Sequence, residues 1–224
     1  MGVRRTAAVT AGSKLAPRYA GTFVRGTLDR AIDGFVPLRS AAAAADARLV
    51  DRDGDVEAAI AAWVRQHATL AGAQGFVTNL GGIATYAVAL PANVVGVTLV
   101  QCHLVAGIAH LRGYDLENPR VRNAILACML GEDSVTSLVK KHRLPSSPMA
   151  LATSPVHDPA LDDTLSREVT TEIFARAAGK RAVTLIGRRV PLIGGAVGAS
   201  SDALSTWQIG QYAADELRDR RLPG

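Results

Sequence analysis

The most informative pattern in the chain is a long apolar stretch without formal charge. Residues 66–111 contain no Asp, Glu, Lys or Arg. A glycine pair interrupts the stretch near residue 81, and Pro91 suits the first position of a new helix, because its φ is already fixed at a helical value. The pattern predicts a glycine-rich helical hairpin, with a short helix over 78–90 and a longer one over 91–111.

Elsewhere, apolar residues recur at helical spacing, and proline, glycine and small polar residues separate the segments. No segment shows the alternation of a strand. We therefore predict helices over 19–39, 55–71, 119–130, 132–142, 159–178 and 191–218, with a proline-rich loop at 144–159. The expected fold is all-α. It is a single compact multi-helix domain over 19–219 with the apolar hairpin at its centre, and it follows a basic tail at 1–18.

Composition agrees with a helical fold. The 224 residues are 48% apolar but only 4% aromatic, and 21 are glycine, which favours tightly packed small-residue helices over a β-sandwich. The net charge of +5 resides in residues 1–39, where seven Lys and Arg face two Asp. This asymmetry indicates an anionic partner, either lipid headgroups or nucleic acid. Two cysteines cannot form a disulfide framework and fit a reducing, cytoplasmic compartment.

The segment 91–111 is long enough to cross a membrane, which takes about 20 apolar residues. Its content argues against crossing, because it includes Asn93, Gln101 and two histidines. A second apolar segment, 190–214, is interrupted by Asp202, and a carboxylate at mid-bilayer costs about 2.5–3.5 kcal/mol. We expect a hairpin buried in protein, and insertion into a membrane is the alternative.

One face of the predicted helix 91–111 combines small residues with imidazoles. At 100° per residue, Gly96, His103, Gly107 and His110 fall within about 60° of one another. Small residues allow another backbone to approach closely, as in small-xxx-small seams. Two core histidines hydrogen-bonded to their neighbours are the simpler interpretation, and a ligand site is the sharper one.

The last helix carries a similar seam, in which Gly194, Gly198 and Asp202 follow one another at steps of four. A buried carboxylate needs a partner or takes up a proton. The candidate partners are His103, His110 and Arg112. A structural ion pair explains Asp202 most simply. A polar spot inside an apolar cavity is the functional alternative, in which His103, His110 and Asp202 orient a ligand between the glycine seams.

A basic cluster lies between the two apolar regions: Arg176, Lys180, Arg181, Arg188 and Arg189, with no acid from 176 to 189. Near an anionic bilayer each such charge contributes about 1 kcal/mol of attraction. A solvated helix face is the alternative. Nucleic acid is disfavoured as a partner, because the basic segments lack interleaved aromatics and no recognition motif occurs.

Signatures of catalysis and of cofactors are missing from the sequence. It contains no G-x-S-x-G, P-loop or H-E-x-x-H motif and no cysteine pair with metal-ligand spacing. His103 and His110 are separated by about 10.5 Å of helical rise, too far for one metal ion. We therefore predict no catalytic residues, metal or cofactor, and the chain gives no basis for predicting an oligomeric state.

Two segments together resemble the EcsC protein family. The first runs from Thr78 to Asn93 and continues to Tyr114, and the second runs from Gly179 to Val183 and then from Val190 to Asp202. The resemblance covers roughly residues 55–215. It implies a mostly helical bacterial protein, cytoplasmic or membrane-associated, and it supplies no catalytic residues.

The expected function is non-enzymatic. We expect a lipid-like or other hydrophobic ligand at the glycine-lined seams, or peripheral association with the inner face of the plasma membrane through the basic cluster. One alternative is a hydrolase or transferase that uses His103 with Asp202 as general base. Another is a structural partner of a membrane complex of the ABC-transporter kind, on which the apolar hairpin would dock.

Overall fold

The computed structural model describes residues 22–34, 39–80, 82–186 and 191–218, with side chains given outside 74–93 and 178–199. Over these ranges it contains nine helices and no strand, packed as one domain, so the all-α prediction is confirmed. After a first helix at 22–33, the elements are α2 (Ala41–Val50), α3 (Val56–Leu80), α4 (Gly82–Leu111), α5 (Pro119–Leu130), α6 (Glu132–Lys140), α7 (Pro148–Thr153), α8 (Pro159–Ile186) and α9 (Pro191–Glu216).

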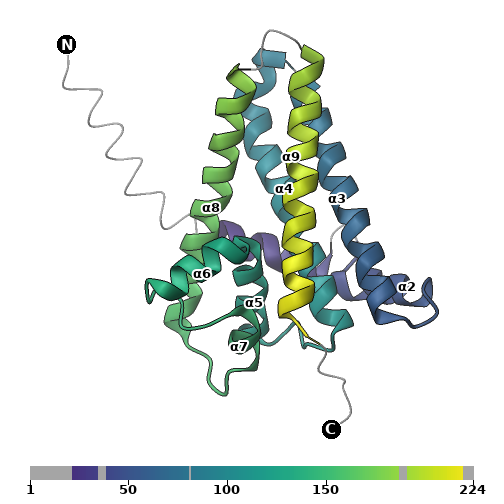
Figure 1. Ribbon diagram of the computed structural model, residues 1–224, viewed down its shortest axis with the longest axis vertical. Helices are drawn as coiled ribbons and strands as arrows, with labels where there is room; N and C mark the ends of the chain where they lie inside the picture. The colour runs from purple at the N-terminus through teal and green to yellow at the C-terminus, as the bar shows by residue number, and fades with distance from the viewer. Residues whose placement is uncertain (1–21, 35–38, 81, 187–190, 219–224) are drawn as a thin grey trace, which may run out of the picture.

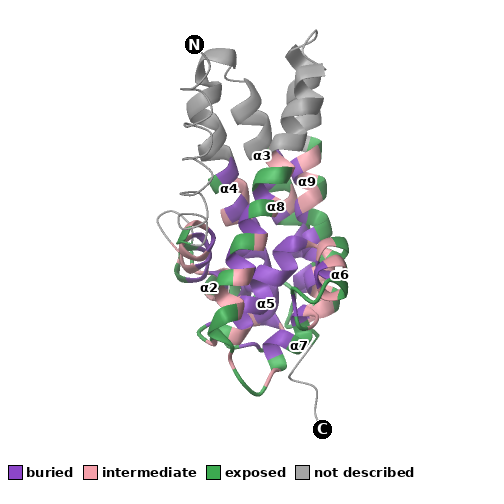
Figure 2. Ribbon diagram, turned by 90° about the vertical axis from the view of Figure 1, so that its left-hand side faces the viewer, coloured by how far each residue is buried: buried purple, intermediate pink, exposed green. Residues whose placement is uncertain are grey.

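Four long helices, α3, α4, α8 and α9, run lengthwise beside one another (Figure 1). The shorter helices α5, α6 and α7 pack around one end of this bundle, and Figure 2 shows many buried residues among the described ones at this end. The core at this end is aliphatic, with Leu104, Ile108, Ile125 and Leu126 fully buried. The core of the described residues therefore lies at this end, which we call the body of the protein.

Local sequence signals set several helix boundaries. The Asn118 side chain accepts a hydrogen bond from the Arg120 backbone N–H, and Pro119 is the first residue of α5. Gly131 ends α5 with a φ of 80°, a conformation that favours glycine. Asp55 caps α3 by accepting from the Ala58 N–H. The predictions for α5 and for the start of α3 are confirmed.

The predicted division of the apolar hairpin is wrong. Instead of helices over 78–90 and 91–111, the structure has α3 running to Leu80 and α4 running unbroken from Gly82, so that Pro91 lies inside α4. An interior proline removes one helical hydrogen bond and an interior glycine costs about 1 kcal/mol, and both are tolerated where a helix packs along its length. Packing along α3 and α9 therefore outweighs these local breaks in α4.

The proline-rich segment 144–159 is also more ordered than predicted, because it contains α7. Pro148 occupies the first turn of this short helix, and Leu151 and Ala152 are buried beside α5. Helix α8 extends to Ile186 rather than ending near 178, so Lys180 and Arg181 belong to a helix. Burial of two apolar side chains explains α7, which proline spacing alone does not reveal.

The C-terminal ends of α3 and α8 and the N-terminal ends of α4 and α9 lie at the same end of the bundle (Figure 1, top). We call this the distal end. It lies opposite the end packed by α5, α6 and α7. Among the described residues, one helical window, Val94–Leu111, is long and apolar enough to cross a membrane, and 67% of it is buried inside the protein.

Candidate functional site

His103, on the predicted polar face of α4, lies in a buried aromatic cluster with two residues of α3. His67 Nε2 lies 2.9 Å from His103 Nδ1, and the two rings stack with centroids 5.2 Å apart. The Trp63 ring lies 4.2 Å from His67 and 5.2 Å from His103, centroid to centroid. All three residues are 2% exposed. We call Trp63, His67 and His103 the histidine cluster.

Trp63 also explains one glycine of the seam on α4. Its indole N–H donates to the Leu104 carbonyl oxygen over 3.1 Å. A Cβ added to Gly107 would lie 2.5 Å from Trp63 Nε1 and 2.6 Å from Cε2. The small residues were expected to admit another backbone, but at Gly107 the indole ring of Trp63 occupies the space.

The two ends of the histidine pair contact backbone carbonyls. His67 Nδ1 lies 2.9 Å from the Trp63 oxygen, and His103 Nε2 lies 3.1 Å from the Arg39 oxygen. Both ring nitrogens of His103 are thus engaged, by His67 and by Arg39. Neither is left for a carboxylate, so this geometry gives no support to a His103–Asp202 general base.

Burial dominates the electrostatics of the pair. It lowers the pKa of His67 to about 3, with the Trp63 carbonyl acting in the opposite direction and the charges of His103 and Arg48 lowering it further. Burial also lowers the pKa of His103, and the hydrogen bond to the Arg39 carbonyl opposes that shift. Near neutral pH these directions favour two uncharged imidazoles.

His110 lies on the same helix but in a different environment. Its Nε2 is 2.7 Å from Asp46 Oδ1 on α2, and its side chain is 25% exposed. Arg112, the third candidate partner of Asp202, pairs with Glu57 on α3. Gly96 lies on α4 and is half-buried. The structure therefore places His103 and His110 in separate contacts.

Asp202 is buried on α9, at 2% exposure, and it is among the residues engaged in polar interactions. Thr206 follows Asp202 by four residues on α9. Its Oγ1 accepts a hydrogen bond over 3.1 Å from the side-chain amide of Gln101 on α4. Polar side chains thus join α4 and α9 at the level where the two seams were expected. Gly194 and Gly198 fall among residues of α9 whose side chains lie outside the described part.

Arg176 is the one member of the basic cluster whose side chain is described. Its guanidinium donates to Glu172 Oε1 over 2.8 Å and to the carbonyl oxygens of Met129 and Leu130 at the end of α5. Arg176 therefore caps a helix C-terminus, a position that favours cations. Lys180, Arg181, Arg188 and Arg189 lie outside the described side chains.

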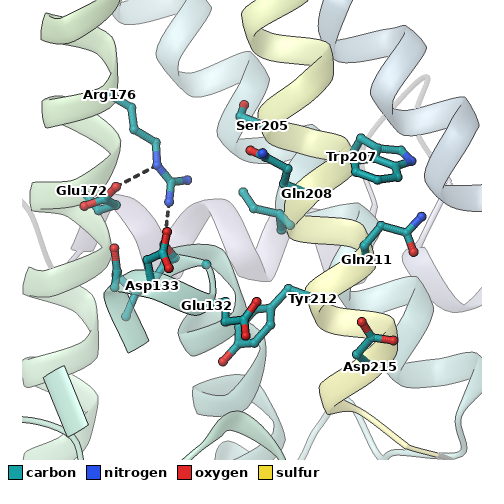
Figure 3. A pocket seen from close by; sticks show the side chains of 14 residues that line it. Glu132, Asp133, Glu172, Arg176, Ser205, Trp207, Gln208, Gln211, Tyr212 and Asp215 are labelled. Atoms are coloured by element: carbon teal, nitrogen blue, oxygen red, sulfur yellow. Dashed lines mark hydrogen bonds and ion pairs between the residues drawn. The ribbon is translucent and has the colours of Figure 1, made fainter. Parts of the chain in front are cut away.

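Sequence reasoning missed a cleft of about 430 Å³ between α6, α8 and α9 (Figure 3). Four acidic residues line it, with Arg176 and two aromatic side chains: Glu132, Asp133, Glu172, Asp215, Trp207 and Tyr212. Burial, followed by the charges of Cys128, Glu216 and Glu132, raises the pKa of Tyr212 so that it stays protonated. The acids at the start of α6 suit a helix N-terminus, so the sequence alone gave no reason to expect a cleft.

His67 was also missed. It lies one helical turn after Trp63 and inside the charge-free stretch. A histidine on an apolar helix face was therefore already visible in the sequence of α3. Its partner is 36 residues away in sequence, and only the packing of α3 on α4 brings the two rings together. In the described part of the chain, no three His, Cys, Asp or Glu side chains gather as metal ligands.

The fold and the cluster define an all-helical protein whose buried polar groups lie between the helices of a long bundle. The model of the EcsC protein family matches residues 27–222. The chain therefore belongs to the EcsC protein family, as the two glycine-rich segments indicated. No curated protein and no solved structure matches the chain.

Proposed function

We propose that the protein associates peripherally with an anionic membrane surface through the distal end of its bundle. The inner face of the plasma membrane is the surface that the two free cysteines favour, because free thiols fit a reducing compartment. One observation carries the proposal: the helix ends of the charge-free hairpin α3–α4 and of the basic, glycine-rich α8–α9 segment lie at the same end of the molecule.

The sequence at and between these helix ends suits a lipid interface. Residues 74–93 contain no charged residue, and residues 178–199 contain Lys180, Arg181, Arg188 and Arg189 without an acid. Four cations near an anionic surface contribute about 4 kcal/mol of attraction at about 1 kcal/mol each. Apolar residues between them add a hydrophobic contribution, which combines with the charge in interfacial binding.

Packing limits how deep the association can go. The apolar window of α4, Val94–Leu111, is mostly buried against other helices, so that part of α4 is committed to the protein core. Only the distal part of the hairpin is available to lipid without unfolding the body. Binding at the surface, weakened by salt, therefore fits this fold better than insertion of a spanning hairpin.

Vesicle flotation tests the proposal, comparing phosphatidylcholine alone with equal parts phosphatidylcholine and phosphatidylglycerol. The double variant Arg188→Gln/Arg189→Gln should weaken binding to the anionic vesicles by about 30-fold, because it removes about 2 kcal/mol of attraction. The matched control is Lys140→Gln/Lys141→Gln, which removes two exposed cations at the opposite end of the bundle.

The control should change binding by less than about twofold, because those lysines lie at the end of α6, away from the distal end, and solvent ions screen exposed charges over a Debye length of about 8–10 Å. Equal loss in both variants would mean that the protein binds through its overall charge. Equal binding to neutral and anionic vesicles, or binding that high salt does not weaken, would contradict a peripheral electrostatic mode.

The hydrophobic-ligand alternative has less support. It requires space between the glycine seams, and the Trp63 ring occupies that space at Gly107. The cleft between α6, α8 and α9 is open and lined by acids, which does not suit an acyl chain. Native mass spectrometry of protein purified without detergent separates the two functions, because a ligand-binding protein would retain lipid in solution.

A further inference from the structure

The histidine cluster poses a problem of proton counting. The chain of contacts runs from the Trp63 carbonyl through His67 and His103 to the Arg39 carbonyl, with successive separations of 2.9, 2.9 and 3.1 Å. Carbonyl oxygens only accept hydrogen bonds, so each end of the chain requires an N–H on the imidazole that faces it. The contact between the two rings requires one more. Three protons are needed, and two neutral imidazoles carry two.

One of the three contacts must therefore lack its hydrogen bond whenever the pair is uncharged. A missing proton between the two rings would leave two buried lone pairs facing each other over 2.9 Å with no access to water, so the loss is less costly at an end of the chain. The contact of His67 with the Trp63 carbonyl is the shorter and lies within α3, next to a fully packed ring. The contact of His103 with the Arg39 carbonyl is the longer, and Arg39 is exposed. Losing the hydrogen bond between His103 Nε2 and the Arg39 carbonyl is less costly, because the carbonyl of this exposed residue can turn to water.

We propose that His103 Nε2 is a proton-binding site that links acidification to the attachment of Arg39 at the entry to α2. In the uncharged pair, His67 carries its proton on Nδ1 and donates to Trp63. His103 carries its proton on Nδ1 and donates to His67 Nε2. The lone pair of His103 Nε2 then faces the Arg39 carbonyl. A third proton on Nε2 converts this contact into a charge-assisted hydrogen bond.

The position of Arg39 gives the proton a structural consequence. Ser40 follows directly and caps α2 by accepting from the Ala43 N–H, so the Arg39 carbonyl lies at the entry to α2. Protonated His103 attaches this entry to α4. Neutral His103 repels the carbonyl and leaves the entry held by its other contacts. The device therefore has two states at one peptide group.

The charged groups on the helices packed around His103 influence the pH at which His103 Nε2 binds its proton. From α2, Arg48 opposes protonation of His67, and Asp46 is engaged by His110. On α3 and α4, Glu57 and Arg112 neutralise each other, and α9 contributes the buried Asp202. Burial lowers the pKa of His103, so the third proton binds below the ordinary histidine range. The switch is thus an acid-side one.

Long-range ¹H–¹⁵N NMR of the imidazoles tests this directly in the full chain. At pH 7.5 we expect both His67 and His103 as Nδ1–H tautomers, whereas an exposed histidine favours the other tautomer. On acidification His103 Nε2 should protonate before any nitrogen of His67, and the backbone amide signal of Ser40 should shift with the same midpoint.

Several outcomes would overturn the assignment. They are an Nε2–H tautomer of His103 at pH 7.5, a charged His103 already at that pH, or protonation that leaves the Ser40 amide signal unmoved. His67→Phe provides an independent check, because it removes the acceptor for Nδ1–H. In a folded His67→Phe protein, His103 should change to the Nε2–H tautomer and donate to Arg39 at neutral pH. His110→Gln, the control on the same helix, should leave both tautomers unchanged.

Discussion

His103 and His110 lie seven residues apart on one face of α4, yet the regions around them differ in every physical respect. His103 is enclosed by Trp63, His67 and the Arg39 carbonyl, and burial lowers its pKa. His110 lies at the surface beside Asp46 and shares a shallow groove with Tyr114. The same residue type, repeated at nearly the same helical angle, thus makes a buried polar contact in one place and a surface contact with a carboxylate in the other.

The difference shows that helical periodicity places a side chain on a face, while its neighbours decide its chemistry. A glycine seam that looked like the lining of a cavity is filled by an indole ring where it passes His103. Near His110, α2 supplies a carboxylate instead. We therefore expect the regions around His103 and His110 to respond differently to mutation and to pH.

The largest effect is expected where the histidine cluster is most tightly packed. Gly107→Ala places a methyl group 2.5 Å from the Trp63 ring, which is buried and hydrogen-bonded and so cannot easily move. Overpacking of this kind should lower the free energy of unfolding by about 3 kcal/mol. Urea denaturation followed by circular dichroism measures the change.

Gly26→Ala is the matched control. Gly26 lies in the first helix, and an added Cβ there meets nothing within 4 Å. Alanine should therefore raise the free energy of unfolding by up to about 1 kcal/mol, because it favours the helix. If the two variants shifted stability alike, the close approach of Trp63 to Gly107 would not exist in solution.

Local signals were enough to predict the helical class and several helix ends. Asn118, Pro119 and Gly131 act within a few residues of themselves, so their sequence pattern was sufficient. The continuity of α4 through Pro91 could not be predicted in the same way, because it depends on packing against α3 and α9. Helix α7 was missed for a similar reason, since the burial of Leu151 and not the proline spacing accounts for it.

The candidate site was predictable only in part. His103 was selected because it is polar in an apolar helix, and that criterion applied equally to His67, which lay outside the helix under consideration. The pairing of the two rings could not be predicted, because it depends on how α3 and α4 are aligned along each other. Arg176 was assigned to a basic face, although it serves as the cap of α5.

The next largest effect is a loss of stability in acid caused by His67. Its pKa is lowered to about 3 in the folded protein, against about 6.5 in the unfolded chain. Between these values the unfolded chain binds a proton that the folded protein does not, so stability rises with pH in this window. Going from pH 7 to pH 5 should lower the free energy of unfolding by about 2 kcal/mol through this residue.

Urea titrations at the two pH values measure this loss. His67→Phe should reduce the difference between pH 7 and pH 5 by about that amount, whatever its effect on stability at pH 7. A wild-type protein equally stable at both pH values, or a His67→Phe variant with an unchanged pH dependence, would show that His67 is solvated in solution.

The smallest effect is expected at the surface histidine. His110→Gln removes the contact with Asp46, whose side chain is 60% exposed, and exposed pairs of this kind contribute less than about 1 kcal/mol. Urea denaturation of His110→Gln measures the loss. A loss comparable with that of Gly107→Ala would mean that the region of His110 is as tightly enclosed as that of His103, and the contrast between the two histidines would disappear.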